Sequence, residues 1–166
     1  MARIAYADPD RLTPELRTWF DNLPPDPRLF LAFAQAGGTA GLVMDSALAL
    51  HRAVELPERL VELVAFTVIR VENSEYLRLH HNPREGLLSD AERDAILRGT
   101  DAPSFDERDR AVLRLAEAVA KGPRVDDDTF AAARKHLSDR ELVELIQAHA
   151  FYWMCARTCS VLDIEP

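Results

Sequence analysis

The sequence predicts an all-α protein, and three observations carry that prediction. Apolar residues recur at helical spacing along the whole chain, and no run alternates strictly between apolar and polar residues as a half-buried strand would. Two capping boxes, which begin at Ser89 and Ser138, mark helix starts. Glycine and proline residues separate the periodic segments from one another. We therefore expect a single-domain helical bundle.

The first third of the chain predicts three helices. Thr13 and Pro14 are an N-cap and a first-position proline, and the helix that they start is expected to end at Pro24 and Pro25. The glycine pair between the second and third helices is interpreted as a kink with close helix packing. The expected ranges are 14–23, 27–36 and 39–54.

Six further helices are expected in the rest of the chain. Pro57 begins the fourth helix, Ser74 or Asn73 caps a short fifth helix, and Pro83 stops it. The two capping boxes begin the sixth and the last helix. The expected ranges are 57–73, 74–82, 89–98, 104–121 or 106–121, 126–136 and 138–161.

Composition excludes several classes of function. The chain has 166 residues, enough for one domain with a real core, and a net charge of −8 with acids and bases interspersed. Nucleic acids and anionic membranes need a basic face, so neither partner is expected. No apolar run reaches transmembrane length, and no signal peptide is recognised, so a cytoplasmic location is expected.

Two of the expected helices, over residues 60–71 and 142–156, are apolar on nearly every side. A helix that is apolar all round must be covered all round. In a domain of this size a neighbouring subunit is one plausible cover. We therefore expect a homo-oligomer, either a dimer, a trimer or a hexamer.

Glu62 is the first candidate catalytic residue. It lies in a nearly continuous apolar run whose other polar residues are Thr67 and Arg70. A buried carboxylate responds to burial by a raised pKa or by finding a partner, which is how a general acid or base is tuned. The alternative is an ordinary ion pair with Arg59 near the start of the helix.

His81 is the second candidate, because histidine is the natural proton shuttle near neutral pH. On a helix it shares one face with Ser74 and Leu77, whereas His80 points about 100° away and is not expected to serve the same site. The alternative is a surface or capping histidine. The chain has neither an HExxH motif nor zinc-ligand spacing, so no metal and no cofactor are expected.

The last helix offers a third group of candidates. His149 and Tyr152 lie three residues apart and could line an apolar pocket, or they could be core residues with satisfied polar tips. Cys155 and Cys159, the two cysteines of the chain, are interpreted as reduced core thiols. They are not a CxxC pair near a helix start, where thiolates are favoured.

The segment from Arg59 to Gly86 resembles the carboxymuconolactone decarboxylase and alkylhydroperoxidase D-like (AhpD-like) superfamily. That family typically shows an Arg-(x)-Glu-Leu pattern on an inner helix, and a Cys-x-(Tyr/His)-Cys-x-x-x-His element begins twelve residues after the glutamate. Here the second element reads Ser74-Glu75-Tyr76-Leu77-Arg78-Leu79-His80-His81. The resemblance covers residues 26–164 and implies an AhpD-like helical domain over 26–166, with residues 1–25 as a helical segment packed on it.

The resemblance also implies roles for individual residues. Glu62 and His81 stand at the positions of the proton-relay glutamate and histidine, whereas Ser74 and Leu77 stand where the redox cysteines would be. Thiol peroxidase chemistry needs sulfur at those two positions, so peroxidase activity of the family type is not expected. Gly86 also follows His81 more closely than in many members, so about one helical turn is missing there.

Three hypotheses of function follow. The first is a cofactor-free acid–base enzyme acting on a small organic acid, lactone or enolisable carbonyl compound. In it Glu62 and His81 move a proton, while substrate-binding residues are Ser74, Tyr76, Leu77, His149 and Tyr152. The second is a non-catalytic oligomeric protein that binds a small molecule or serves as a scaffold. The third is an alkylhydroperoxidase-like antioxidant protein that uses Cys155 and Cys159.

Overall fold

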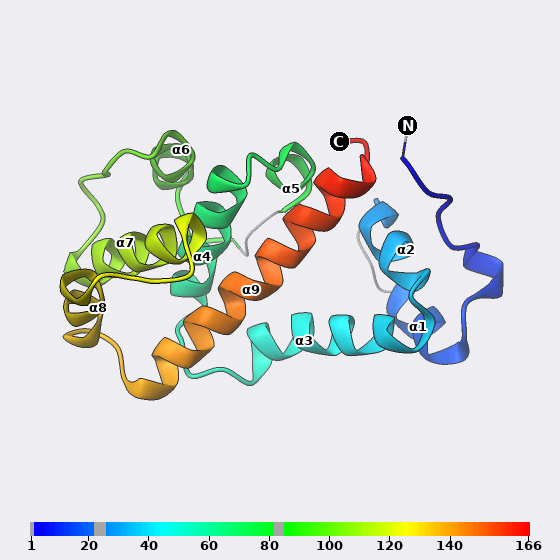
Figure 1. The fold of residues 1–166 in the computed structure, drawn as a ribbon, viewed down its shortest axis with the longest axis horizontal. Coiled ribbons are helices and arrows are strands. Elements are labelled where there is room, and N and C mark those ends of the chain that lie inside the picture. Colours follow the sequence, from blue (N-terminus) through cyan, green and yellow to red (C-terminus); the bar gives the residue numbers. More distant parts are fainter. Residues whose placement is uncertain (1, 22–25, 82–84) are drawn as a thin grey trace.

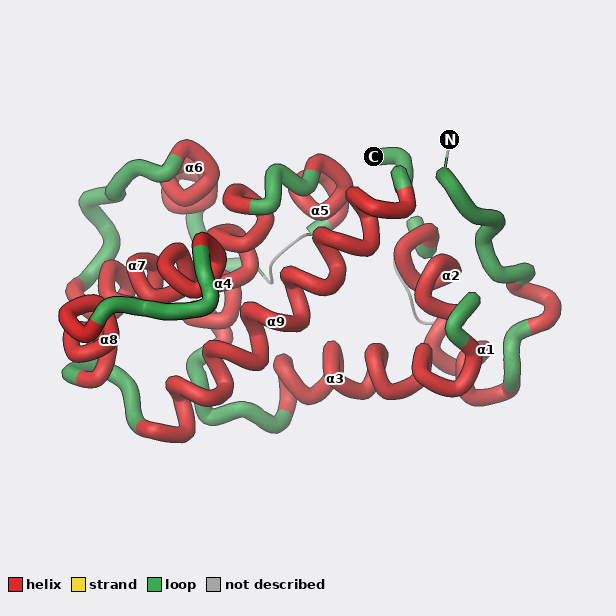
Figure 2. The backbone as a smooth tube through the Cα atoms, in the orientation of Figure 1, coloured by secondary structure: helices red, strands yellow, loops and turns green. Residues whose placement is uncertain are grey.

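The computed structural model describes residues 2–21, 26–81 and 85–166, and every regular element within these ranges is helical (Figure 2). The all-α prediction is therefore confirmed. Two short 3-10 turns, Pro9–Arg11 and Gly37–Thr39, accompany the α-helices. The α-helices are α1 (Pro14–Phe20), α2 (Arg28–Ala34), α3 (Ala40–Arg52), α4 (Glu58–Val71), α5 (Glu75–His80), α6 (Asp90–Arg98), α7 (Glu107–Lys121), α8 (Asp127–Arg134) and α9 (Asp139–Leu162).

Helix starts follow the capping residues that the sequence offers. The side chains of Thr13, Asp106 and Asp126 each accept a backbone N–H in the first turn of α1, α7 and α8. The serines of both predicted capping boxes, Ser89 and Ser138, exchange hydrogen bonds with a glutamate three residues later. These local hydrogen bonds satisfy backbone donors that a helix start would otherwise leave unpaired.

Two details of the prediction differ from the structure. Helix α1 ends at Phe20, and the expected stops at Pro24, Pro25 and Pro83 lie outside the described residues. The kink between α2 and α3 is present, because Gly37 has φ +58° and begins a 3-10 turn. The close packing expected there is wrong, since a Cβ added at Gly37 or Gly38 would meet no atom within 4 Å.

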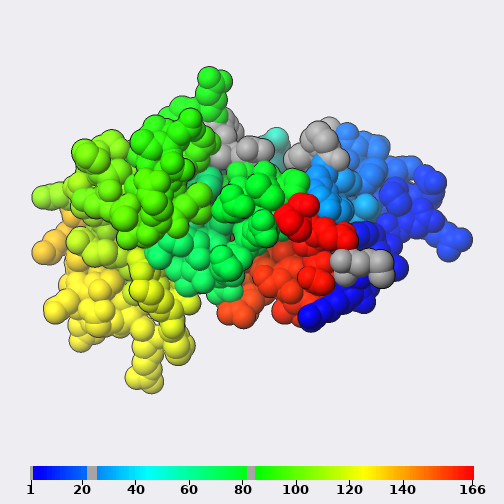
Figure 3. Space-filling model, turned by 90° about the horizontal axis from the view of Figure 1, so that it is seen from above, coloured from blue at the N-terminus to red at the C-terminus, as the bar shows by residue number. Residues whose placement is uncertain are grey.

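Helices α6, α7 and α8 form one end of the molecule, and α1 and α2 form the other (Figure 1). Helix α9 crosses diagonally between the two ends, and α3 runs below it. The space-filling view shows the same separation of the N-terminal residues from the region near residue 130 (Figure 3). The N-terminal stretch returns to the end of α9, where Arg3 N donates to Leu162 O at 2.8 Å.

The main core surrounds α4. Every residue from Leu60 to Ile69 is buried, and the cover comes from α6, α7 and α9 of the same chain. A neighbouring subunit is therefore not needed to cover α4, contrary to the expectation. Helix α9 differs, because it leaves Val143, Ile146 and Trp153 exposed at 56%, 49% and 43%. No helix within the described ranges combines the length and apolarity needed to cross a lipid bilayer.

A second, smaller core joins α1, α2 and α3. Leu16 of α1 packs there with Phe30 and Leu31 of α2 and Ala40 of α3. This cluster includes residues on both sides of the domain boundary that was expected at residue 25. It holds α2 and α3 against each other, and these two helices supply one wall of the cavity described next.

Candidate active site

The candidate site begins with a pair of side chains from α4 and the end of α5. Glu62 lies within the buried stretch of α4 and is 1% exposed. His81 is the residue that ends α5, and its backbone is extended, with φ −82° and ψ 107°. His81 Nε2 lies 2.7 Å from Glu62 Oε2, within hydrogen-bond distance. The two candidates for proton transfer are therefore in direct contact.

Arg59 does not pair with Glu62, so the alternative of an ordinary Arg59–Glu62 ion pair is wrong. The Arg59 guanidinium donates to Asp109 Oδ2 at 2.8 Å and to Glu92 Oε1 at 2.6 Å. It also donates to the carbonyl oxygen of Leu87 at 2.7 Å. These contacts bind α4 to α6 and α7 and leave the Glu62 carboxylate to His81.

Two aromatic rings lie against His81. The His81 ring lies 5.4 Å from the Phe66 ring and 5.2 Å from the Tyr152 ring, measured between centroids, and Tyr152 meets it edge-on. Burial raises the pKa of Tyr152, and the nearby negative charge of Glu62 raises it further. Tyr152 is thus a neutral phenol, and this side of the imidazole is shielded from water.

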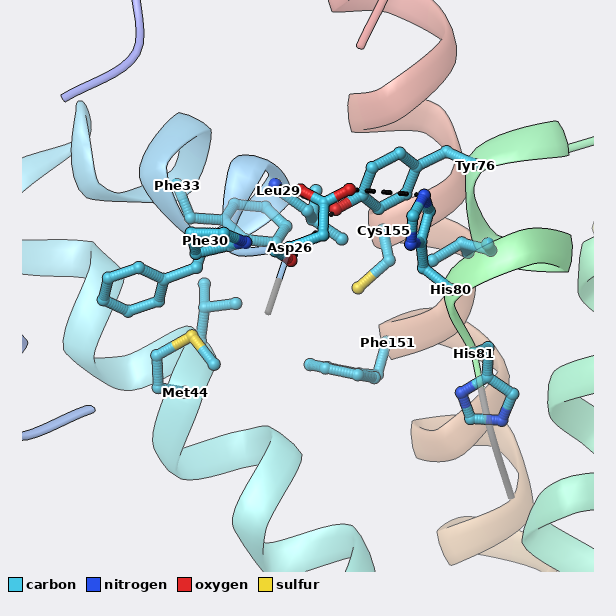
Figure 4. A pocket seen from close by; sticks show the side chains of 13 residues that line it. Asp26, Leu29, Phe30, Phe33, Met44, Tyr76, His80, His81, Phe151 and Cys155 are labelled. Carbon is cyan, nitrogen blue, oxygen red and sulfur yellow. Dashed lines mark hydrogen bonds and ion pairs between the residues drawn. The ribbon is translucent and has the colours of Figure 1, made fainter. Parts of the chain in front are cut away.

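A cavity of about 480 Å³ opens on the other side of His81 (Figure 4). Its volume is typical of small-molecule sites. Glu62 is not one of its lining residues, so His81 stands between the carboxylate and the cavity. Helices α2, α3, α5 and α9 and the residues that flank α2 and α5 supply the lining. It is mostly apolar and consists of Asp26, Pro27, Leu29, Phe30, Phe33, Val43, Met44, Tyr76, Leu77, His80, His81, Phe151 and Cys155.

His80 lines the same cavity, which corrects the expectation that adjacent histidines would not serve one site. The helical angle of about 100° between neighbours applies only while the helix continues. Helix α5 ends at His80, and the extended backbone of His81 lets both rings reach the cavity. His80 Nε2 lies 3.3 Å from Asp26 Oδ2, and its ring packs on Tyr76 with 4.5 Å between centroids.

Asp26, which sequence reasoning missed, is held at the start of α2 by several contacts. Arg28 Nε donates to Asp26 Oδ1 at 2.8 Å, and this guanidinium holds the pKa of the Asp26 carboxyl below its usual range. The Tyr76 hydroxyl accepts from Leu29 N at 3.4 Å and lies 3.5 Å from the Asp26 carbonyl oxygen. Burial raises the pKa of Tyr76 to about 12, so its hydroxyl stays protonated.

The structure brings some of the predicted binding residues to this cavity and leaves others apart. Tyr76 and Leu77 line the cavity, and Tyr152 packs against His81 on the side of the core. Ser74 does not line it, because its hydroxyl faces the start of α5 and borders a separate hollow of about 280 Å³. His149 does not line it either; its ring is buried, and Nε2 has no hydrogen-bond partner.

The two cysteines are buried in α9. Burial raises the pKa of Cys155 and of Cys159 to about 12. Cys155 lines the cavity, but its thiol is protonated at any physiological pH. Within residues 2–21, 26–81 and 85–166, no three histidine, cysteine or acidic side chains converge as a metal site would require.

Comparisons with known proteins find similarity in structure alone. No protein-family profile matches the sequence, and no curated protein matches it. Among solved structures, a cysteine-to-alanine variant of the debrominase Bmp8 in complex with 2,3,4-tribromopyrrole superimposes with a TM-score of 0.80 at 17% identity. That similarity covers 99% of this chain and 89% of the debrominase.

Two further structures are similar. An uncharacterised peroxidase-related protein from Silicibacter sp. TM1040 has a TM-score of 0.75 at 18% identity, over 99% of this chain and 91% of that one. A protein of unknown function from Agrobacterium tumefaciens, which has been suggested to be the antioxidant defence protein AhpD, has a TM-score of 0.70 at 21% identity. That similarity covers 80% of this chain and 94% of the Agrobacterium protein. The chain thus has the AhpD-like fold.

Proposed function

We propose that this chain is a cofactor-free acid–base enzyme of the lyase, decarboxylase or isomerase type, with a small organic acid, lactone or enolisable carbonyl compound as its substrate. The observation that carries the proposal is the 2.7 Å contact between Glu62 and His81 at the wall of the cavity. A fold alone does not specify a reaction, so the proposal rests on these side chains.

The arrangement gives each residue of the pair a separate task. The Glu62 carboxylate accepts a hydrogen bond from His81 Nε2. It therefore favours the tautomer of His81 that carries its proton on Nε2. The other ring nitrogen, Nδ1, then has a free electron pair with which to take a proton from a substrate. The carboxylate stabilises the imidazolium that forms, as the acid of a catalytic triad does.

The surroundings of His81 favour proton transfer over hydration. Its side chain is only 16% exposed, and aromatic rings cover it on the side of the core. The cavity beyond it is lined mostly by apolar side chains. Charge interactions are stronger where water is excluded, so the Glu62 carboxylate is well placed to interact with charge that develops on the imidazole during the reaction.

The same features argue against a thiol peroxidase. Ser74 and Leu77 occupy the positions at which the resemblance places redox cysteines. Cys155 and Cys159 have pKa values near 12, so neither supplies the thiolate that attacks a peroxide.

A non-catalytic ligand-binding protein is the second candidate. The cavity supports it, because a mostly apolar lining binds apolar molecules without any reaction. A further support is the complex of the similarly folded debrominase variant with 2,3,4-tribromopyrrole, in which a protein of this fold has a small ring compound bound. In this function His81 would donate or accept a hydrogen bond and move no proton.

The test uses Glu62→Gln and His81→Ala against a panel of small organic acids, lactones and ketones, followed by product analysis. Loss of a general base lowers kcat by roughly a hundredfold to ten-thousandfold, so His81→Ala should lose nearly all turnover. Glu62→Gln should lose about tenfold or more, because glutamine does not stabilise the imidazolium.

A second His–Glu pair provides the matched control. His51 Nδ1 lies 3.5 Å from Glu58 Oε1, and neither residue lines the cavity. His51→Ala and Glu58→Gln should keep wild-type turnover. Turnover that is unchanged in both Glu62→Gln and His81→Ala would overturn the proposal. Tight binding of a panel compound without any turnover by the wild type would favour the second candidate.

A further inference from the structure

The cavity contains a second histidine with a carboxylate partner, His80 with Asp26, in addition to His81 with Glu62. Resting on the proposed function, we infer that His80 is a second catalytic residue and that the substrate is an enolisable carbonyl compound. His80 protonates the carbonyl oxygen while His81 removes a proton from the neighbouring carbon.

The two histidines are presented to the cavity in similar ways. Each has one ring nitrogen beside a carboxylate oxygen. For His81 this contact is a hydrogen bond of 2.7 Å, whereas for His80 it is an ion-pair contact of 3.3 Å in which Nε2 makes no hydrogen bond. Figure 4 shows the second ring nitrogen of His80 on the side of Cys155, and one nitrogen of His81 turned towards Phe151. Two proton-transfer groups thus border one space.

The contacts around His80 hold its ring in place for this task. Tyr76 stacks on it, and the Tyr76 hydroxyl joins α5 to the start of α2 through Leu29 N and the Asp26 carbonyl oxygen. Arg28 fixes the Asp26 carboxylate through its own N–H and its guanidinium. Asp26 is therefore a positioning residue: Arg28 holds its carboxylate beside His80 Nε2, at ion-pair distance, where it stabilises a protonated ring.

The proton transfers balance within the cavity. Neutral His81 takes a proton at Nδ1 from the carbon next to the carbonyl, and the C–H electron pair becomes the C=C bond. The C=O π pair moves to oxygen, which receives a proton from Nδ1 of protonated His80. One histidine gains a proton as the other loses one, so the net charge of the cavity stays constant.

This charge balance is the physical advantage of two histidines. Creating a new charge among apolar side chains is costly, because the lining cannot solvate it. With a single base the enolate oxygen would carry such a charge, and a second histidine removes it as it forms. Loss of carbon dioxide from an acid leaves an electron pair on carbon without removal of a C–H proton by a base. A decarboxylation therefore does not use both histidines directly, whereas the enolisation of a carbonyl compound does.

The experiment measures deuterium incorporation into acetophenone and phenylacetone in D2O by NMR, as a function of ketone concentration. The reverse transfer returns deuterium from His81 to carbon after its proton has exchanged with solvent. His80→Ala and His80→Gln should each lower the exchange rate at saturation by about a hundredfold and change KM less than threefold. Asp26→Asn should lower it by about tenfold, again in kcat rather than KM.

The outcomes separate this inference from the proposed function. If His81→Ala abolishes the exchange and both His80 variants keep the wild-type rate, the role of His80 is overturned and the proposed function stands. Turnover of an acid or lactone that depends on His81, without ketone exchange, would overturn the substrate class. The exposed His51→Ala control should exchange at the wild-type rate. If the exchange rate falls equally in that control, the effect of the His80 variants comes from general destabilisation, and the role of His80 is overturned.

Discussion

Arg59 and Glu62 lie about one turn apart on α4, yet the Arg59 guanidinium binds Asp109, at 2.8 Å, and leaves Glu62 to His81. These two charged residues of α4 thus serve different purposes. Arg59 joins α4 to the helices packed against it, and Glu62 contacts the imidazole at the cavity. Because Arg59 is already paired with two acids, it does not compete with His81 for the Glu62 carboxylate.

The Arg59 contacts predict an acid-sensitive stability. Hydrogen bonding to Arg59 is the main cause that lowers the pKa of Glu92 from its ordinary value of 4.5 to about 2. Below pH 4.5 the unfolded chain binds this proton first, so about 2–3 kcal/mol of stability is lost as the pH falls towards 2. Urea unfolding across this range should show the loss in the wild type and much less of it in Glu92→Gln.

The second capping box supplies the control for this measurement. Glu141→Gln removes the equivalent glutamate at the start of α9 and keeps Glu92. It should retain the wild-type loss of stability between pH 4.5 and 2. An undiminished loss in Glu92→Gln would contradict the assignment to the Arg59–Glu92 pair.

His149 predicts a stability change at milder pH. Burial lowers the pKa of its imidazole below the ordinary value of 6.5, and Nε2 has no hydrogen-bond partner. Below pH 6.5 the unfolded chain gains a proton that the folded chain does not, so the folded state loses stability. His149→Leu should remove this loss and add about 1 kcal/mol at neutral pH, because no unpaired nitrogen stays buried.

The measurement is urea unfolding at about pH 7.5 and about pH 5.5, on either side of the ordinary histidine pKa. His51→Leu removes a partly exposed histidine and keeps His149, so the loss on the acid side should persist in that variant. Equal pH dependence in the wild type and in His149→Leu would refute the assignment.

The cysteines of α9 should be unreactive in the folded protein. With a pKa of about 12, roughly one Cys155 thiol in ten thousand is ionised at pH 8. Iodoacetamide should therefore alkylate Cys155 and Cys159 at least a hundredfold more slowly in the native protein than in urea. Mass spectrometry gives both rates. Rapid consumption of the two thiols by hydrogen peroxide in the native protein would instead support the antioxidant function.

The exposed face of α9 predicts association of the chain with copies of itself. Val143, Ile146 and Trp153 lie at helical spacing on that face, and each is more than two-fifths exposed. Light scattering after gel filtration should show a homo-oligomer, and Trp153→Glu should shift it towards the monomer. The matched control is Leu42→Glu, at a residue of α3 that is 65% exposed. A monomer mass for the wild type in light scattering would contradict this prediction.

The order of the helices could be predicted from the sequence because their start signals are local. Ser89 and Ser138 exchange hydrogen bonds with residues only three positions away, so short-range sequence determines the structure there. Ser74 shows the limit of that approach. Its spacing placed it on the face of His81, but as the cap of α5 its hydroxyl is directed to the backbone N–H of Leu77.

The remaining features of the site depend on tertiary contacts that no local pattern contains. Arg59 is three positions from Glu62 in sequence, yet its partners Asp109 and Glu92 come from helices much later in the chain. Asp26 lies in a connecting segment before α2, without periodicity to identify it. Its meeting with His80 depends on how α2 packs against α5, which only the folded chain determines.

The end of α5 has a consequence for how this site could change. A helix of six residues stops between two consecutive histidines, and this termination aims both rings at one space. If α5 continued through His81, the two rings would point about 100° apart around the helix axis. The length of a single short helix therefore decides whether one histidine or two meet the same bound molecule. Insertions or deletions there would alter chemistry without replacing either residue.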